Sequence, residues 1–93
     1  MITITLCDDD LSVVKTCMEY AKQFEREHGR VLEWRFPEQP QSVSPEELAR
    51  EDILILDIEI GDLNGIDLAR QIRLYNEQTI IIFSTNYLEY ALQ

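Results

Sequence analysis

Acidic or hydroxyl-bearing side chains follow three apolar segments of this chain, at the point where each segment ends. They are Asp8, Asp9 and Asp10 beyond residues 2–6, Asp57 after residues 53–56, and Thr85 beyond residues 79–83. An apolar run without alternation is typical of a parallel strand that helices cover on both faces. Ligands of open α/β sheets bind beyond the carboxyl ends of the strands. Asp57 is therefore the candidate functional residue, and the other side chains are expected around it.

Three of these side chains, those of Asp8, Asp9 and Asp57, meet if the first and third strands are neighbours. Two unit charges about 4 Å apart repel by about 4 kcal/mol at an effective dielectric of about 20, so three carboxylates need a cation or a raised pKa. Mg²⁺ binds carboxylate oxygens while keeping several waters, and it is the predicted cofactor. With Mg²⁺ bound, an aspartate could accept a phosphoryl group, because the metal offsets charge on the transferring oxygens.

Each group also has a plain structural interpretation. Residues 8–10 could do no more than favour the positive end of a helix, Asp57 could be a turn residue, and Thr85 could cap a helix. The combination favours a site, because the groups stand one strand–helix unit apart and parallel strands end at the same edge of a sheet.

The elements that must position these groups alternate between strands and helices. Strands are expected at residues 2–6, 31–36, 53–57 and 79–83, and helices from Leu11 to Gly29, from Ser44 to near Arg50, over 66–75 and from Tyr87 to Gln93. The first helix should bury Leu11, Val14, Cys17 or Met18, Ala21 and Phe24. Residues 37–43 are read as a loop and 61–65 as a turn. This alternation predicts an α/β fold with a doubly wound parallel sheet and right-handed crossovers.

Composition limits the possible functions. The chain has 93 residues with 18 Asp and Glu against 8 Lys and Arg, so its formal charge is −10. Such an acidic domain is not expected to bind nucleic acid or an anionic membrane by itself. No apolar run approaches the roughly 20 residues of a membrane span. Cys7 and Cys17 lack metal-site spacing and are expected to be reduced thiols of a cytoplasmic protein.

Taken together, four segments resemble the receiver domain of two-component response regulators. They are Cys7-Asp8-Asp9-Asp10, Leu56-Asp57-Ile58-Glu59, Asn64-Gly65 and Ser84-Thr85-Asn86-Tyr87. The resemblance covers residues 1–93 and implies a flavodoxin-like fold with strand order 2-1-3-4. The sequences of residues 57–59 and 87–92 are similar to those of receivers that precede a LytTR-type DNA-binding domain, the accessory-gene-regulator group.

The resemblance also implies a role for individual residues. Asp57 would be the phosphoacceptor, Asp9 a direct Mg²⁺ ligand, and Asp8 a ligand directly or through water. The backbone carbonyl of Glu59 would complete the metal site, and Thr85 would be the switch hydroxyl. A sensor histidine kinase would supply the phosphoryl group. The chain would not be an enzyme beyond assisting its own phosphorylation and dephosphorylation, and DNA would be reached only through an output domain that is missing here.

Three departures from the receiver pattern stand out. Gly61 replaces a common Pro, and Asn86 replaces the small residue after the switch hydroxyl. The third departure is that the chain has four of the five βα units, without the fifth strand, its terminal Lys and the last helix. Such a shortened domain is expected to be phosphorylated poorly, and to form a homodimer or a swapped oligomer through the exposed apolar strand 79–83.

Two other functions stay open at this level. The same fold could be a degenerate receiver that acts as a protein-interaction module without phosphorylation. The chain could also be an unrelated metal-dependent phosphotransferase, although it contains no glycine-rich phosphate-binding loop.

Overall fold

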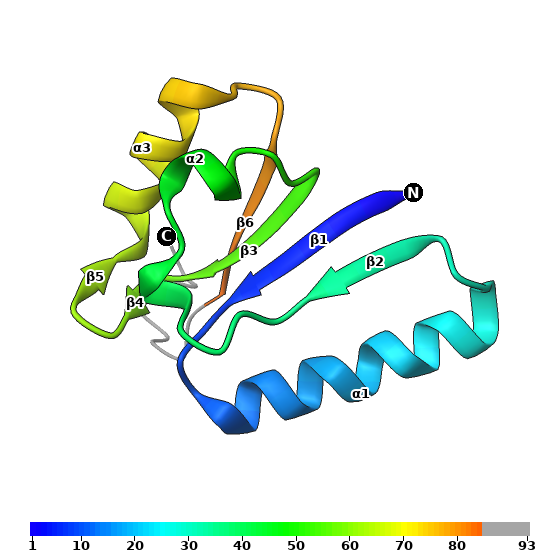
Figure 1. Ribbon diagram of the computed structural model, residues 1–93. Coiled ribbons are helices and arrows are strands. Elements are labelled where there is room, and N and C mark those ends of the chain that lie inside the picture. The colour runs from blue at the N-terminus through cyan, green and yellow to red at the C-terminus, as the bar shows by residue number, and fades with distance from the viewer. Residues whose placement is uncertain (85–93) are drawn as a thin grey trace.

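The computed structural model describes residues 1–84. Its main sheet has four parallel strands in the order β2-β1-β3-β6, and Figure 1 shows them side by side. The strands are β1 (Ile2–Cys7), β2 (Leu32–Arg35), β3 (Ile53–Asp57) and β6 (Ile80–Ser84). This confirms the predicted α/β class and the predicted order 2-1-3-4, with β6 as the fourth long strand.

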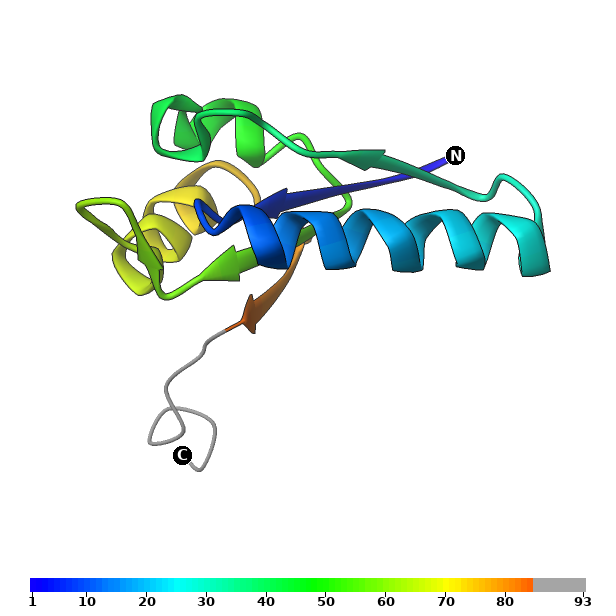
Figure 2. The ribbon, with the colours of Figure 1, turned by 90° about the horizontal axis from the view of Figure 1, so that it is seen from below.

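Helices cover both faces of this sheet. Figure 1 shows α1 on one side of the strands and the shorter α2 and α3 on the other. These helices are α1 (Leu11–His28), α2 (Pro45–Leu48) and α3 (Gly65–Tyr75). Strands β2 and β6 lie at the two edges of the sheet (Figure 2). None of the helices described has the length and apolar content that a bilayer crossing requires.

The main core lies between the sheet and the α2–α3 layer. Its buried members are Cys7, Leu48, Ala49, Leu54, Leu56, Ile60, Leu68, Ala69 and Ile72. Alternate strand residues point to opposite faces, so Leu54 and Leu56 face this core while Ile53 and Ile55 face α1 and are only half-buried. Burial also raises the pKa of the Cys7 thiol to about 12, so this thiol stays protonated at neutral pH.

The α1 layer is covered less completely than the sequence pattern predicts. Among the described residues of α1, Ala21 alone is buried, while Leu11 is 73% exposed. The expectation that Leu11 faces the core is wrong, because Leu11 is the first residue of α1, directly after the cap Asp10, and its side chain stays exposed there. Phe24 is 38% exposed and packs against the ring of His28.

Local signals set the ends of the helices as expected. Asp10 caps α1 by accepting hydrogen bonds from the Ser12 N–H at 2.9 Å and from its hydroxyl at 2.7 Å. The Ser44 hydroxyl accepts from the Glu47 N–H at 3.2 Å at the start of α2. Gly29 ends α1 with φ of 80° and ψ of −179°, a backbone conformation that favours glycine.

Two segments are more ordered than predicted. The expected turn over 61–65 belongs to a small antiparallel hairpin of β4 (Glu59–Ile60) and β5 (Leu63–Asn64), with Gly61 at φ of 58°. The expected loop contains the 3₁₀ helix η1 (Pro40–Ser42). Short backbone hydrogen-bonded turns of this kind leave little hydrophobic periodicity, which explains why the pattern did not predict them.

Candidate functional site

Three carboxylates converge beyond the carboxyl ends of β1 and β3. One oxygen from each of Asp8, Asp9 and Asp57 lies within 4.8 Å of the other two. The strand register brings them together, because Cys7 pairs with Leu56 and the chain continues from each into an aspartate. The predicted convergence of Asp8, Asp9 and Asp57 is therefore present in the structure.

Asp8 is the buried member of the cluster, with 5% of its surface exposed. Its Oδ1 accepts a hydrogen bond from the Asp10 backbone N–H at 2.8 Å, which fixes the carboxylate at the start of the loop. Burial raises the pKa of Asp8, and the charges of Asp57, Asp9 and Asp10 raise it further. A cation that enters the cluster would therefore stabilise the ionised form of Asp8.

Asp9 is exposed, and a distant part of the chain holds its side chain. Its Oδ2 accepts a hydrogen bond from the backbone N–H of Gly61 at 2.9 Å. This contact ties the loop after β1 to the β4–β5 hairpin. The sequence pattern marked Gly61 only as a departure from the common Pro, and a Pro there would have no N–H to donate.

Asp57 is half-buried at the end of β3, between the other two acids and the turn that follows. Its Oδ1 accepts from the Glu59 backbone N–H at 3.4 Å. Burial raises the pKa of Asp57, and the charges of Asp9 and Glu59 add to this rise. Glu59, whose backbone carbonyl is the predicted fourth ligand, is the first residue of β4 and lies two residues beyond Asp57.

Gly65 has a steric role beside Asp57. A Cβ added at Gly65 would lie 2.0 Å from the carbonyl oxygen of Asp57, which no real side chain permits. The Gly65 N–H also donates to the carbonyl of Ile58 at 2.6 Å. The first residue of α3 is thus packed directly on the backbone that carries Asp57, as expected for a glycine in a close turn.

The remaining predicted residues lie elsewhere or outside the described part. Asp10 acts as the cap of α1, and its hydrogen bonds from Ser12 lower its pKa. Ser84 ends β6 opposite Asp57 in the register. Thr85, Asn86 and the helix expected over 87–93 lie outside the described residues.

The donor set of the cluster fits a hard divalent cation. All three groups offer carboxylate oxygens, which are the ligands that Mg²⁺ and Ca²⁺ prefer. Burial and, to a smaller extent, the neighbouring carboxylates raise the pKa values of Asp8 and Asp57, and a bound cation would favour their ionised forms. Asp8, Asp9 and Asp57 are the residues that would hold such an ion.

Comparisons by sequence with protein-family models and with curated proteins find no match. Among solved structures, the chain is similar to the "MaeR response regulator bound to beryllium trifluoride", with a TM-score of 0.67 and 24% sequence identity. The similarity covers 99% of this chain and 77% of that one. The chain has the fold of a response regulator. This confirms the doubly wound, flavodoxin-like architecture, with the acidic cluster at the carboxyl edge of its sheet.

Proposed function

We propose that this chain is the phosphoacceptor receiver of a two-component response regulator. The observation that carries the proposal is the meeting of Asp8, Asp9 and Asp57, whose carboxylate oxygens lie within 4.8 Å of one another. The fold shared with a response regulator that binds beryllium trifluoride supports the same function. The cluster has the acidic composition and position that such a site needs.

Asp57 is the proposed nucleophile. One of its carboxylate oxygens forms a bond to phosphorus while the bond from phosphorus to the donor breaks. Mg²⁺, held by Asp8, Asp9, Asp57 and the backbone carbonyl of Glu59, would supply positive charge beside the transferring oxygens. The hydrogen bonds from Asp10 and Gly61 hold the carboxylates of Asp8 and Asp9 where they could serve as ligands of this ion.

The finer parts of the proposal rest on the sequence resemblance. A sensor histidine kinase is the proposed phosphoryl donor, and Thr85 is the proposed switch hydroxyl. The proposed output is transcription regulation through a DNA-binding domain of the LytTR type, in the cytoplasm. The chain itself would act as a phosphoacceptor that assists only its own phosphorylation and dephosphorylation.

Incubation with acetyl phosphate and Mg²⁺, followed by intact mass spectrometry, tests the proposal. We expect a mass gain of one phosphoryl group in a minor fraction of the protein, because the shortened domain should be phosphorylated poorly, and this gain should be lost with EDTA and in Asp57→Asn. Asp52→Asn is the matched control, because Asp52 lies just before the amino end of β3 and bonds to Thr3, far along the strand from the cluster. This control should label like the unaltered protein.

Two outcomes would contradict the proposal. Equal labelling of Asp57→Asn would exclude Asp57 as the acceptor. An unlabelled protein that also shows no change on Mg²⁺ titration would favour the degenerate receiver, which uses the same fold as an interaction module.

A further inference from the structure

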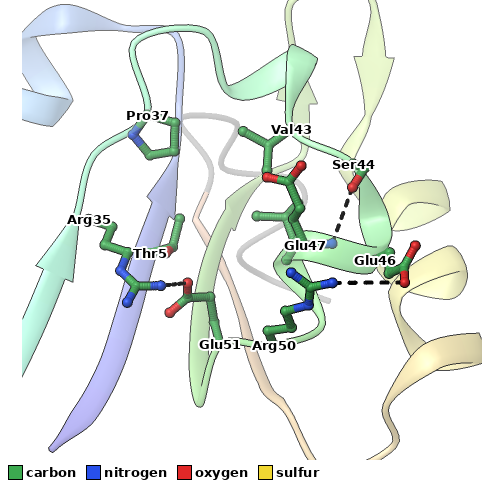
Figure 3. A pocket seen from close by; sticks show the side chains of 10 residues that line it. Thr5, Arg35, Pro37, Val43, Ser44, Glu46, Glu47, Arg50 and Glu51 are labelled. Atoms are coloured by element: carbon green, nitrogen blue, oxygen red, sulfur yellow. Dashed lines mark hydrogen bonds and ion pairs between the residues drawn. The ribbon is translucent and has the colours of Figure 1, made fainter.

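A second polar cavity lies away from the acidic cluster, between the middle of β1, the end of β2 and α2 (Figure 3). Its volume is about 470 Å³, within the range of small-molecule sites. None of Asp8, Asp9 and Asp57 lines it. The proposed phosphoacceptor function makes no use of this cavity, so its side chains need an explanation of their own.

Glu51 is the buried charged group of the cavity wall, with 6% of its surface exposed. Figure 3 shows its carboxylate pointing toward Arg35, which donates to Oε1. The other oxygen, Oε2, is buried and accepts no hydrogen bond from any residue that the structure describes. A buried carboxylate oxygen without a donor is unfavourable, and an N–H group of a ligand would remove that cost.

Glu47 offers a second carboxylate without a donor, at the other end of the cavity in Figure 3. Its backbone N–H caps α2 on Ser44, but within residues 1–84 its carboxylate has no hydrogen bond or ion pair. The two arginines of the cavity are engaged, because Arg35 binds Glu51 and Arg50 lies 3.9 Å from Glu46. The buried Glu51 Oε2 and the solvent-exposed Glu47 carboxylate are therefore the two negative groups of the cavity that its arginines do not engage.

The cavity wall also has an apolar part. Pro37, Val43 and Leu48 line it there. A ligand that matches this arrangement carries a positive charge at each end and a short hydrocarbon chain between them. The formal charge of −10 on the protein favours the approach of such a dication.

We propose that this cavity binds a linear aliphatic diamine, with one ammonium group donating to Glu51 Oε2 and the other to the Glu47 carboxylate. The half-exposed Arg35 side chain covers Glu51 and moves aside as the first ammonium group enters. The apolar chain of the diamine then lies along Val43 and Leu48.

The test is a titration of the whole 93-residue chain with 1,4-diaminobutane at fixed ionic strength in saturating MgCl₂, followed by ¹⁵N-edited NMR and calorimetry. We expect saturable shifts at Val43, Glu47 and Glu51. Butylamine should bind at least about tenfold more weakly, because it leaves one carboxylate without a donor. Butan-1-ol should cause no saturable shift.

Three variants with the same change in charge separate specific binding from general attraction to an acidic protein. Glu51→Gln and Glu47→Gln should each weaken diamine binding by at least about tenfold. Glu33→Gln is the matched control, because Glu33 also pairs with Arg35, at 3.5 Å, but does not line the cavity. Its affinity should stay within about twofold of the unaltered protein. Glu47 is exposed, so Glu47→Gln should fold normally and can still test the proposal if Glu51→Gln unfolds.

The proposal is overturned by any of three results. One is equal affinity for diamine and butylamine, and another is an equal effect of all three variants. The third is shifts confined to Asp9 and Gly61, which would place the diamine at the acidic cluster instead. Failure here leaves the phosphoacceptor function untouched, because acetyl phosphate labelling of Asp57 is read independently.

Discussion

The Asp9 carboxylate and the Gly61 backbone, 52 residues apart in sequence, are joined by a hydrogen bond of 2.9 Å. Asp9 is one of the three acids of the proposed metal site, and Gly61 connects the strands of the β4–β5 hairpin. A cation that binds Asp9 therefore acts on a carboxylate that already holds the hairpin. This side chain couples the metal site to the turn of the hairpin, and Asp57 adds a second link by accepting from the Glu59 N–H of β4.

Neutralising Asp9 should separate its two roles. Asp9→Asn keeps an oxygen for the Gly61 N–H but removes one charge from the cluster, so we expect Mg²⁺ affinity to fall at least about tenfold. Metal-free stability should not fall, because the repulsion with Asp57 is relieved. Asp10→Asn is the matched control, since Asn caps helices as well as Asp. Calorimetric Mg²⁺ titration in which both variants lose affinity equally would contradict this assignment.

The raised pKa of Asp57 predicts how stability depends on pH. Its folded pKa lies above the ordinary value of 3.8. The folded state then binds more protons than the unfolded state between these two pKa values, so stability falls as pH rises through that window. In EDTA, we expect Asp57→Asn to unfold at a higher temperature than the unaltered protein at neutral pH. This advantage should shrink as pH falls toward 3.8.

Thermal unfolding followed by circular dichroism over this pH range measures the difference. Saturating Mg²⁺ should reduce it, because the metal stabilises the ionised carboxylate only where Asp57 is present. An advantage of Asp57→Asn that does not change with pH would show that charge is not its cause.

Gly65 should tolerate no side chain. Gly65→Ala places a Cβ 2.0 Å from the Asp57 carbonyl oxygen, so backbone must shift, and we expect a loss of about 2 kcal/mol or more in the free energy of unfolding. Gly29→Ala is the control: nothing lies within 4 Å of its added Cβ, and only the φ of 80° opposes it. With ψ of −179°, that strain costs about 1–3 kcal/mol. Urea unfolding that ranks Gly29→Ala as the more harmful change would contradict the packing argument.

Strand β6 should promote self-association. Among residues 1–84 it pairs only with β3, and Ile80 and Ile82 are 55% and 49% exposed. An apolar edge strand with unpaired backbone groups recruits another strand. We expect concentration-dependent dimers by light scattering, abolished by Ile82→Lys. Leu74→Lys alters an α3 residue that is 85% exposed and away from the edge, so it should leave association unchanged. A monomer at high concentration would contradict the prediction.

The sequence predicted those features that depend on strand position. The apolar run before Asp57 and the acids after β1 were enough to predict that these carboxylates stand at strand ends, and the strand order that brings Asp8, Asp9 and Asp57 together was implied by the resemblance to receivers. These residues sit where parallel strands end, and that edge is fixed by the topology. The helix boundaries at Gly29 and Ser44 were also predicted, because helix ends depend on near neighbours in the chain.

Contacts between distant, unpatterned positions could not be predicted. The bond from Gly61 to Asp9 uses a backbone N–H, which no residue type reveals. The Arg35–Glu51 pair joins an alternating edge strand to a residue between α2 and β3 that showed no motif. Leu11 is exposed although it fits the periodic pattern, because it is the first residue of α1. Periodicity gives the face of a helix, but it does not give how far the sheet extends beneath that face.

The uneven burial of the two helical layers has a consequence for how the molecule opens. Of the described residues in α1, Ala21 alone is buried, whereas α2 and α3 contribute Leu48, Leu68, Ala69 and Ile72 to the main core. Segments with few buried contacts detach at a lower free-energy cost than the whole fold. Backbone amides in the middle of α1 should therefore exchange with deuterium sooner than those of β3. Helix α1, which follows the Asp8–Asp10 loop, would then open locally while the backbone hydrogen bonds of β3, the strand that carries Asp57, stay intact.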